Sequence, residues 1–266
     1  MQRLRCRYAK RGRLRFASHR DIARTLERAL RRAGVPMAFS AGFTPHPKIS
    51  YAGAAPTGVA SEAEYFELAL ASRRDPDRVR AVLDASLPAD IHLLEVVEAG
   101  PGGLADRLQG SEWEIRLPGV AEDTTREAVD RFLVAETIEV ERLTKKGLRR
   151  FDVRAAVVRM AVSGCADEGP GVRCAILRMV VRHATPAVRP DDVLTGLRLV
   201  AGLAPPSPPL VTRLAQGPLD ATTGRLADPF APDRRTAVSA EPGERDGEPF
   251  AEPVDVVGAQ PRGGSG

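Results

Sequence analysis

Two kinds of hydrophobic spacing alternate along residues 1–99, and their order limits the folds that this part of the chain can adopt. Helical spacing of apolar residues occurs twice, over residues 18–33 and over residues 75–87. The segments around these two stretches are patterned as strands. They are residues 3–9 with a short return strand over residues 13–16, residues 36–41 and 48–52 on either side of a loop, residues 64–70 and residues 91–98. The resulting order, β-α-β-β-α-β, is that of a ferredoxin-like sheet with two helices on one face. We therefore predict an α+β domain over residues 1–99.

The same order returns in the second half of the chain. Residues 100–110 begin with Gly100-Pro101-Gly102-Gly103 and are predicted to form a linker. Strands are then expected over residues 112–117, 138–143, 152–162 and 172–183, helices over residues 123–133 and 190–200, and an edge strand over residues 210–214. Residues 111–219 are therefore predicted to form a second, elaborated ferredoxin-like domain. The similar element order suggests a duplication, although the residues themselves show no internal repeat.

The composition changes at Asp220. Of the 47 residues from there to residue 266, 13 are Pro or Gly, and nine acids against five bases give a net charge of −4. A segment of this kind buries too little apolar surface to offset the entropy lost on ordering. Residues 220–266 are therefore predicted to be a disordered, acidic, Pro/Gly-rich tail.

Positive charge is concentrated at the start of the chain. Residues 1–50 contain 13 Lys or Arg and two acids, a net charge of +11, whereas the whole chain carries +4. Within this region, the helix expected over residues 18–33 has Ser18 as N-cap, with Asp21 completing a capping box. Its apolar residues share one side, and the other side carries Arg20, Arg24, Arg28 and Arg31. A solvated face and a phosphate-binding face are equally good interpretations of this stripe, because the usual interspersed acids are missing.

A second basic cluster is expected in a β-hairpin loop, where long side chains can reach a phosphate backbone. Its residues are Lys145, Lys146, Arg149 and Arg150. Simple exposure to solvent is the alternative. Aromatic residues make up only 5% of the chain, with Phe39, Phe43 and Tyr51 best placed to stack on bases. The scarcity of rings favours contacts to the nucleic-acid backbone over base reading.

Two of the four histidines lie close to the basic helix in sequence. His19 opens the helix, and His46 lies in a loop between two prolines that stiffen the backbone. In a β-α-β unit these two positions can converge, which predicts a polar pocket made of His19, Asp21, Ser40, His46 and Lys48. Such a pocket would bind a phosphate, a nucleotide end or a metal, with hydrolysis as a remoter outcome. Two alternatives stay open: a partly buried His19 bonded to a backbone carbonyl, and a capping role alone for Ser18 and Asp21.

Signatures of the common enzyme classes are absent from the sequence. It contains no phosphate-binding loop, nucleophile elbow, dinucleotide fingerprint or His-Glu-x-x-His pair. The three cysteines lack the spacing of zinc or iron–sulfur ligands, and no spacing demands a metal site. A non-enzymatic role without a cofactor is therefore favoured, and enzymatic activity stays open. The lack of a long apolar run and of a signal-peptide core predicts a cytoplasmic protein without membrane contact.

Several motifs resemble those of the radical SAM-linked family, a domain of unknown function found beside or fused to B12-binding radical SAM enzymes. The resemblance is carried by residues 15–21, 27–34, 40–50 and 58–64, with later pieces at residues 144–147 and 152–154, and it spans roughly residues 1–218. Relative to the family pattern, Ala17 replaces a common Leu and Arg20 replaces an apolar residue. This chain therefore carries extra charge on its helix.

The resemblance implies an association with radical SAM chemistry on RNA such as tRNA or rRNA. Because the chain has no Cys-x-x-x-Cys-x-x-Cys motif, the iron–sulfur cluster, S-adenosylmethionine and cobalamin are expected in a separately encoded partner enzyme. The leading hypothesis is an RNA-binding adaptor that presents a structured RNA to that enzyme. The alternatives are a protein partner subunit that binds no nucleic acid, and a histidine-containing phosphate or metal pocket with hydrolytic activity.

Overall fold

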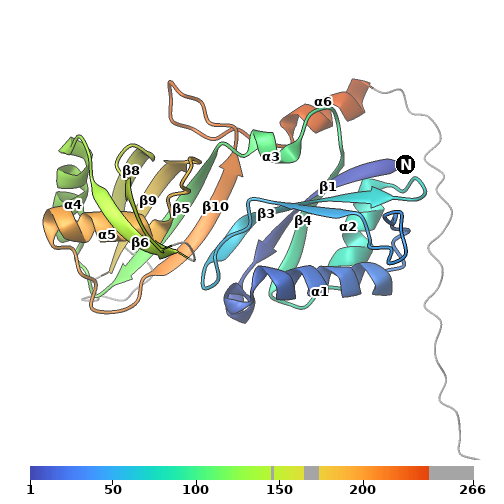
Figure 1. Ribbon diagram of the computed structural model, residues 1–266, viewed down its shortest axis with the longest axis horizontal. Helices are drawn as coiled ribbons and strands as arrows, with labels where there is room; N and C mark the ends of the chain where they lie inside the picture. Colours follow the sequence, from blue (N-terminus) through green and yellow to red (C-terminus); the bar gives the residue numbers. More distant parts are fainter. Residues whose placement is uncertain (145–146, 165–173, 240–266) are drawn as a thin grey trace, which may run out of the picture.

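The computed structural model describes residues 1–144, 147–164 and 174–239 (Figure 1). The first unit follows the predicted order, and its elements are β1 (Gln2–Lys10), α1 (His19–Arg32), β2 (Ile49–Ala52), β3 (Ala60–Leu70), α2 (Pro76–Asp84) and β4 (Ile91–Glu98). The strands lie antiparallel in the order β4-β1-β3-β2, which is the ferredoxin-like arrangement. The short return strand expected over residues 13–16 is instead a 3₁₀ helix, η1 (Gly12–Phe16).

Both helices of the first unit pack on the same face of its sheet. Ile22, Leu26 and Leu30 of α1 and Val79 and Leu83 of α2 share one apolar core. The strands contribute every second residue to this core, as the alternation of side chains across a sheet requires, with Leu4, Cys6 and Tyr8 from β1 and Phe66, Leu68 and Leu70 from β3.

The second unit repeats the arrangement and adds a hairpin. Its elements are β5 (Gly110–Pro118), α4 (Glu122–Val134), β6 (Glu139–Thr144), β7 (Gly147–Asp152), β8 (Val157–Gly164), β9 (Cys174–Arg182), α5 (Pro190–Ala201) and β10 (Leu210–Gly217). The main strands lie in the order β10-β5-β9-β8, again the ferredoxin-like order. β6 and β7 pair only with each other, so the strand expected over residues 138–143 belongs to an inserted hairpin.

β10 joins the two units into one sheet, which corrects the prediction of an edge strand. It pairs antiparallel with β5 and, through Thr212 and Arg213, parallel with Ala60 and Ser61 of β3. The second half of β3 pairs with β2 on that same side. The sheet is therefore continuous from β4 to β8, as the side-by-side placement of the two units in Figure 1 shows.

A buried polar network fills the junction between the units. The Arg213 guanidinium binds the Glu64 carboxylate, donates to Ser61 Oγ at 3.3 Å and lies 5.5 Å from the centre of the Trp113 ring. Nearby, Gln216 Nε2 donates to the carbonyl oxygens of Ala63 (2.7 Å) and Gly53 (3.1 Å). Side chains from β3 and β10 thus hold the junction, where only two residue pairs connect the strands.

Lys10 lies in the same network. It is 3% exposed, and its ammonium donates to the Pro56 carbonyl at 3.4 Å. Burial lowers the pKa of Lys10, and the negative charge of Glu64 opposes this effect. One carboxylate therefore faces two buried cations, Lys10 and Arg213.

The linker and the start of the predicted tail are both structured. α3 (Leu104–Arg107) lies in the linker, and α6 (Ala231–Ser239) lies beyond β10. The prediction of a disordered tail is therefore wrong for residues 220–239, and residues 240–266 lie outside the described part of the chain. Phe230, just before α6, is fully buried and meets the Tyr65 ring edge-on at 5.4 Å. Because Tyr65 and Phe66 are neighbours on β3, this small core covers the face opposite α1 and α2.

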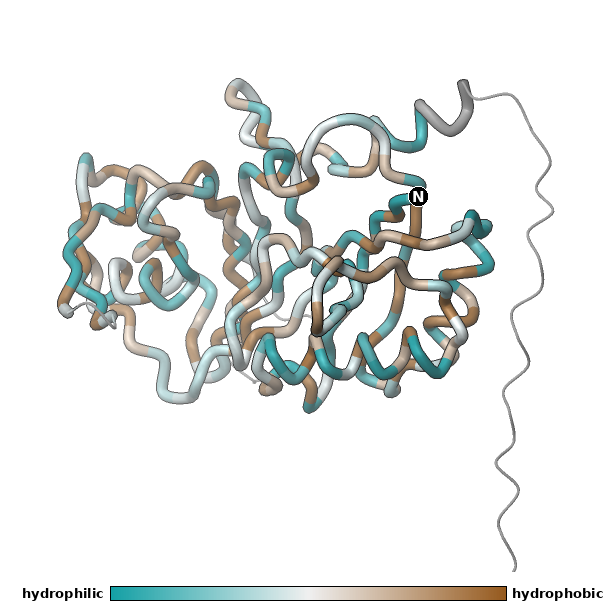
Figure 2. Tube along the Cα trace, turned by 45° about the vertical axis from the view of Figure 1, so that its right-hand side comes forward, coloured by the Kyte–Doolittle hydropathy of each residue, from teal (hydrophilic) through white to brown (hydrophobic). Residues whose placement is uncertain are grey.

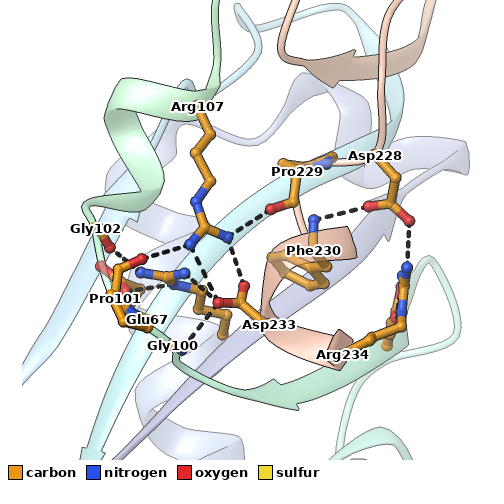
Figure 3. Close-up of polar contacts among 12 residues, drawn as sticks. Glu67, Gly100, Pro101, Gly102, Arg107, Asp228, Pro229, Phe230, Asp233 and Arg234 are labelled. Carbon is orange, nitrogen blue, oxygen red and sulfur yellow. Dashed lines mark hydrogen bonds and ion pairs between the residues drawn. The ribbon is translucent and has the colours of Figure 1, made fainter. Parts of the chain in front are cut away.

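Asp233 fixes α6 to the first unit, as Figure 3 shows. Its buried carboxylate accepts hydrogen bonds from Arg5 Nη1 (2.6 Å), Arg107 Nη1 (2.7 Å) and the Gly100 amide (2.9 Å). Arg5, also fully buried, donates through Nε to Glu67 at 2.9 Å. Hydrogen-bond donors from β1, from the start of the linker and from α3 therefore all bind the carboxylate of Asp233.

Candidate nucleic-acid interface

Helix α1 begins and ends as its sequence predicts. The Ser18 side chain accepts a hydrogen bond from the Asp21 amide at 3.2 Å, and Ser18 Oγ donates to Asp21 Oδ2 at 2.6 Å. The hydrogen bond that the carboxylate accepts from Ser18 Oγ lowers the pKa of Asp21. Gly34, with φ of 65°, lies just after the helix in the left-handed conformation that glycine adopts without strain. Figure 2 shows hydrophilic and hydrophobic residues alternating along this helix.

The capping role of Ser18 leads to a first prediction. Replacing Ser18 with alanine removes the side-chain acceptor of the first helical turn, so we expect the free energy of unfolding to fall by about 1 kcal/mol. Because the Ser18 side chain serves the first turn of the helix, the rest of the fold should stay unchanged. Urea denaturation measures the free energy of unfolding, and circular dichroism measures the helix content of the same sample. An unchanged free energy of unfolding would contradict the capping role.

The outer side of α1 is cationic and almost unpaired. Arg20, Arg24, Arg28 and Arg31 are all exposed. Among the described residues, the one acidic contact of these four arginines joins Arg24 to Asp21 at 4.0 Å, which is too long for a hydrogen bond. Exposed pairs of this kind contribute little and are screened by salt. Four guanidinium groups are therefore available to a negatively charged ligand.

The second basic cluster is less available than its sequence indicates. Arg149 and Arg150 are exposed on β7, and Arg150 Nε lies 3.3 Å from Glu139 and 3.7 Å from Glu141. Lys145 and Lys146 lie outside the described residues. Among the described residues, helix α1 therefore has more arginines without an acidic partner than the β6–β7 hairpin has.

The predicted histidine pocket is not assembled in the fold. His19 is exposed and packs edge-on against the Tyr51 ring, with 4.9 Å between ring centres. His46 and Ser40 close the base of a loop instead, through Ser40 N to the His46 carbonyl (2.9 Å) and His46 N to Ser40 Oγ (3.0 Å). Within the described residues, no hydrogen bond or ion pair links His19 or Asp21 to Ser40, His46 or Lys48.

The extended backbone explains why the two histidines stay apart. Tyr51 follows His46 by five positions, and an extended chain rises about 3.3 Å per residue, so the two residues lie roughly 16 Å apart. Tyr51 pairs with Phe66, whereas the loop that holds His46 begins beyond Leu70, at the far end of β3. Figure 1 places this loop at the C-terminal end of α1, opposite the end that His19 occupies. Ser18 and Asp21 therefore serve as caps of helix α1, and Ser40 and His46 serve to close the loop.

The structure also sorts the three aromatic candidates for stacking. Tyr51 lies partly buried between His19 and Phe66, and burial, with a smaller effect of Glu27, raises the pKa of its hydroxyl. Phe39 and Phe43 are exposed. Two of the three rings are therefore free to contact a ligand. In the ranges that the structure covers, no group of three or more side chains is arranged to hold a metal ion, and no helix is long and apolar enough to cross a bilayer.

These features define the class of protein: two ferredoxin-like units joined in one sheet, with a cationic helix on the first unit. The chain belongs to a family described as uncharacterised proteins conserved in bacteria (DUF2344), whose model matches residues 3–190. No curated protein matches the chain. The family description names no radical SAM enzyme, so the association with such enzymes stays a prediction.

Two solved structures are similar in part. One is a crystal structure of an unknown protein from Galdieria sulphuraria, 12% identical, covering 75% of this chain and 91% of its own, with a TM-score of 0.24. The other contains the first two RRM domains of the yeast poly(U) binding protein Pub1, 10% identical, covering 79% of this chain and 98% of its own, with a TM-score of 0.18. At these TM-scores the likeness supports no argument about function.

Proposed function

We propose that this protein binds structured RNA through helix α1 and presents it to a separate radical SAM enzyme. The observation that carries the RNA part is the row of exposed arginines at positions 20, 24, 28 and 31, which has one acidic contact, at 4.0 Å, among the described residues. Guanidinium groups bind phosphate oxygens through paired hydrogen bonds. A helix rises about 1.5 Å per residue, so the row extends over roughly 16 Å and can follow several phosphates.

The radical SAM part of the proposal depends on the sequence resemblance. The chain lacks the cysteine motif for an iron–sulfur cluster, so a partner enzyme would supply the cluster, S-adenosylmethionine and cobalamin. Purification of the protein from a nuclease-treated lysate tests this part. We expect the radical SAM enzyme to be recovered with the protein. If it is not recovered, the proposed partnership is refuted, and RNA binding is tested separately.

Salt dependence and charge reversal test the RNA part. A protein that neutralises four phosphates should lose affinity about 100-fold between about 50 and 200 mM salt, because each contact releases counterions. Reversal of Arg20, Arg24, Arg28 and Arg31 to glutamate should abolish binding of a short RNA stem-loop and flatten its salt dependence. Fluorescence anisotropy measures both quantities.

A control of equal charge separates a local site from net charge. Reversal of four exposed arginines of the second unit to glutamate changes the net charge by the same amount, and the positions are Arg131, Arg159, Arg182 and Arg198. The control should keep most of its affinity for the stem-loop. Equal losses in the two variants, or no binding by the wild type at low salt, would refute the proposed interface.

A further inference from the structure

The loop that connects α1 to β2 presents two aromatic rings to solvent. Phe43, at its tip, is fully exposed, and Phe39, at its base, is 56% exposed. An aromatic ring that stays in water forgoes the favourable burial of its apolar surface. The exposed Phe43 ring therefore does not stabilise the fold, and a ligand that covers the ring would gain this burial.

The exposure of Phe43 comes with a closed loop. Besides the two bonds between Ser40 and His46, the Lys48 amide donates to the Ala38 carbonyl at 2.8 Å, and Phe39 and Pro47 form a bridge across the base. At the tip, Gly42 has a φ of 122°, a conformation that residues with side chains rarely adopt. The loop therefore holds its tip, with Phe43, away from the sheet.

The surroundings of the loop in sequence are entirely free of acids. From Arg28 to Ser61 the chain contains no Asp or Glu, whereas α1 ends in Arg31 and Arg32 and the loop ends in Lys48. An exposed ring on a loop flanked in sequence by arginines and a lysine suits a ligand that combines negative charge with flat apolar surfaces. Nucleic acid has this combination, because phosphates alternate with bases that stack on aromatic side chains.

We propose that Phe43, supported by Phe39, stacks on unpaired bases of the RNA whose phosphates lie along α1. This inference rests on the proposed function and narrows its ligand. The arginines are placed to contact the backbone of a paired stem, and the rings at the C-terminal end of α1 are placed to contact nucleotides that leave the stem. The ligand class is therefore an RNA stem with an unpaired end or loop, bound with little dependence on base sequence.

Two RNA probes and matched loop variants test the stacking. The probes are a blunt RNA duplex and the same duplex with a single-stranded extension. We expect Phe43→Ala to weaken binding of the extended probe by about 5- to 100-fold and to leave the blunt duplex unaffected. Phe43→Tyr keeps a π face and should retain affinity, whereas Phe43→Leu keeps apolar surface without a ring and should lose it. Leu199→Ala, which removes another exposed apolar side chain from α5, is the control and should change nothing.

The outcomes distinguish this inference from the proposed function. If Phe43→Ala binds both probes like the wild type, the stacking is refuted, while salt-dependent duplex binding keeps the α1 interface. If neither probe binds the wild type, the proposed function fails as well. If Phe43→Ala leaves RNA binding intact but releases the co-purified enzyme, and Phe43→Leu retains that enzyme, the loop is a protein anchor and the stacking is refuted.

Discussion

Replacing Asp233 with alanine is expected to detach α6 and to lower the free energy of unfolding by about 3–5 kcal/mol. The substitution leaves the fully buried Arg5 and the mostly buried Arg107 without the carboxylate that both contact at 2.6–2.7 Å. Arg5 keeps its ion pair with Glu67, whereas Arg107 is left with the carbonyl oxygens of Pro101 and Pro229. A mostly buried charge without a carboxylate partner costs far more than an exposed ion pair contributes. Chemical denaturation measures the loss of stability, and hydrogen exchange of the backbone amides at positions 230, 231 and 233–235 measures the detachment.

The next residue in the helix provides the matched control. Arg234 binds Glu95 and Asp228, but its side chain is 43% exposed. Arg234→Ala should therefore cost about 1 kcal/mol or less. If Asp233→Ala lowered the free energy of unfolding no more than Arg234→Ala does, α6 would be held by its apolar contacts and the buried carboxylate would add little.

The same site gives a pH dependence of definite sign. Burial alone would raise the pKa of Asp233, but hydrogen bonds from Arg5, Arg107 and the Gly100 amide outweigh it, so the pKa lies below its usual value. A carboxylate of this kind stabilises the fold fully above its unfolded-state pKa and loses that contribution as pH falls through the lower, folded-state pKa. Protection of the backbone amides at positions 230, 231 and 233–235 should therefore fade in acid. In Asp233→Asn this acid-dependent step should be missing.

Glu64→Gln is expected to cost about 3–5 kcal/mol as well, at the junction between the two units. Glutamine keeps the shape of the side chain but removes the charge that faces Lys10 and Arg213. The two oxygens of Glu64 accept hydrogen bonds from the Arg213 guanidinium and from the Ala55 amide. Glutamine has one acceptor oxygen in place of two, so its NH₂ group must face one of these two donors. Thermal and urea denaturation should show the loss. The pKa of Lys10 should fall further, because Glu64 is the group that raises it.

Glu62, which lies on the same strand and pairs with Arg11, is the control. Glu62 binds Arg11 at 2.6–2.7 Å, but both side chains are substantially exposed. Glu62→Gln should cost less than about 1 kcal/mol. If Glu64→Gln lowered the free energy of unfolding as little as Glu62→Gln, the loss of the charge facing Lys10 and Arg213 would not matter. The buried network would then not be what holds β3 to β10.

The sequence predicts the parts of this fold that depend on local signals. Ser18 marks the start of α1 and its apolar spacing marks the buried side, so the cationic side is also predictable. The alternating segments predict the two ferredoxin-like units for the same reason.

Long-range pairing is what the sequence does not contain. Nothing in residues 210–217 themselves indicates that they lie between two units. After residue 220 the composition is polar throughout, so Asp233, which binds two buried arginines, cannot be told apart from the other acids of the segment. The expected convergence of His19 and His46 failed because it required the loop to fold back toward the start of α1. The chain between Pro47 and Tyr51 is instead extended, so only its Tyr51 end reaches His19 and the loop with His46 stays at the other end of the helix.

The position of β10 has a consequence for any shortened form of this protein. The family match ends at residue 190, yet β10 lies at residues 210–217, between β5 and β3. A chain cut before Leu210 would have uncapped backbone groups along β5 and along the first residues of β3. Two such bare edges on one molecule invite pairing with other copies, so the shortened chain would tend to polymerise even though every residue of the matched region is present.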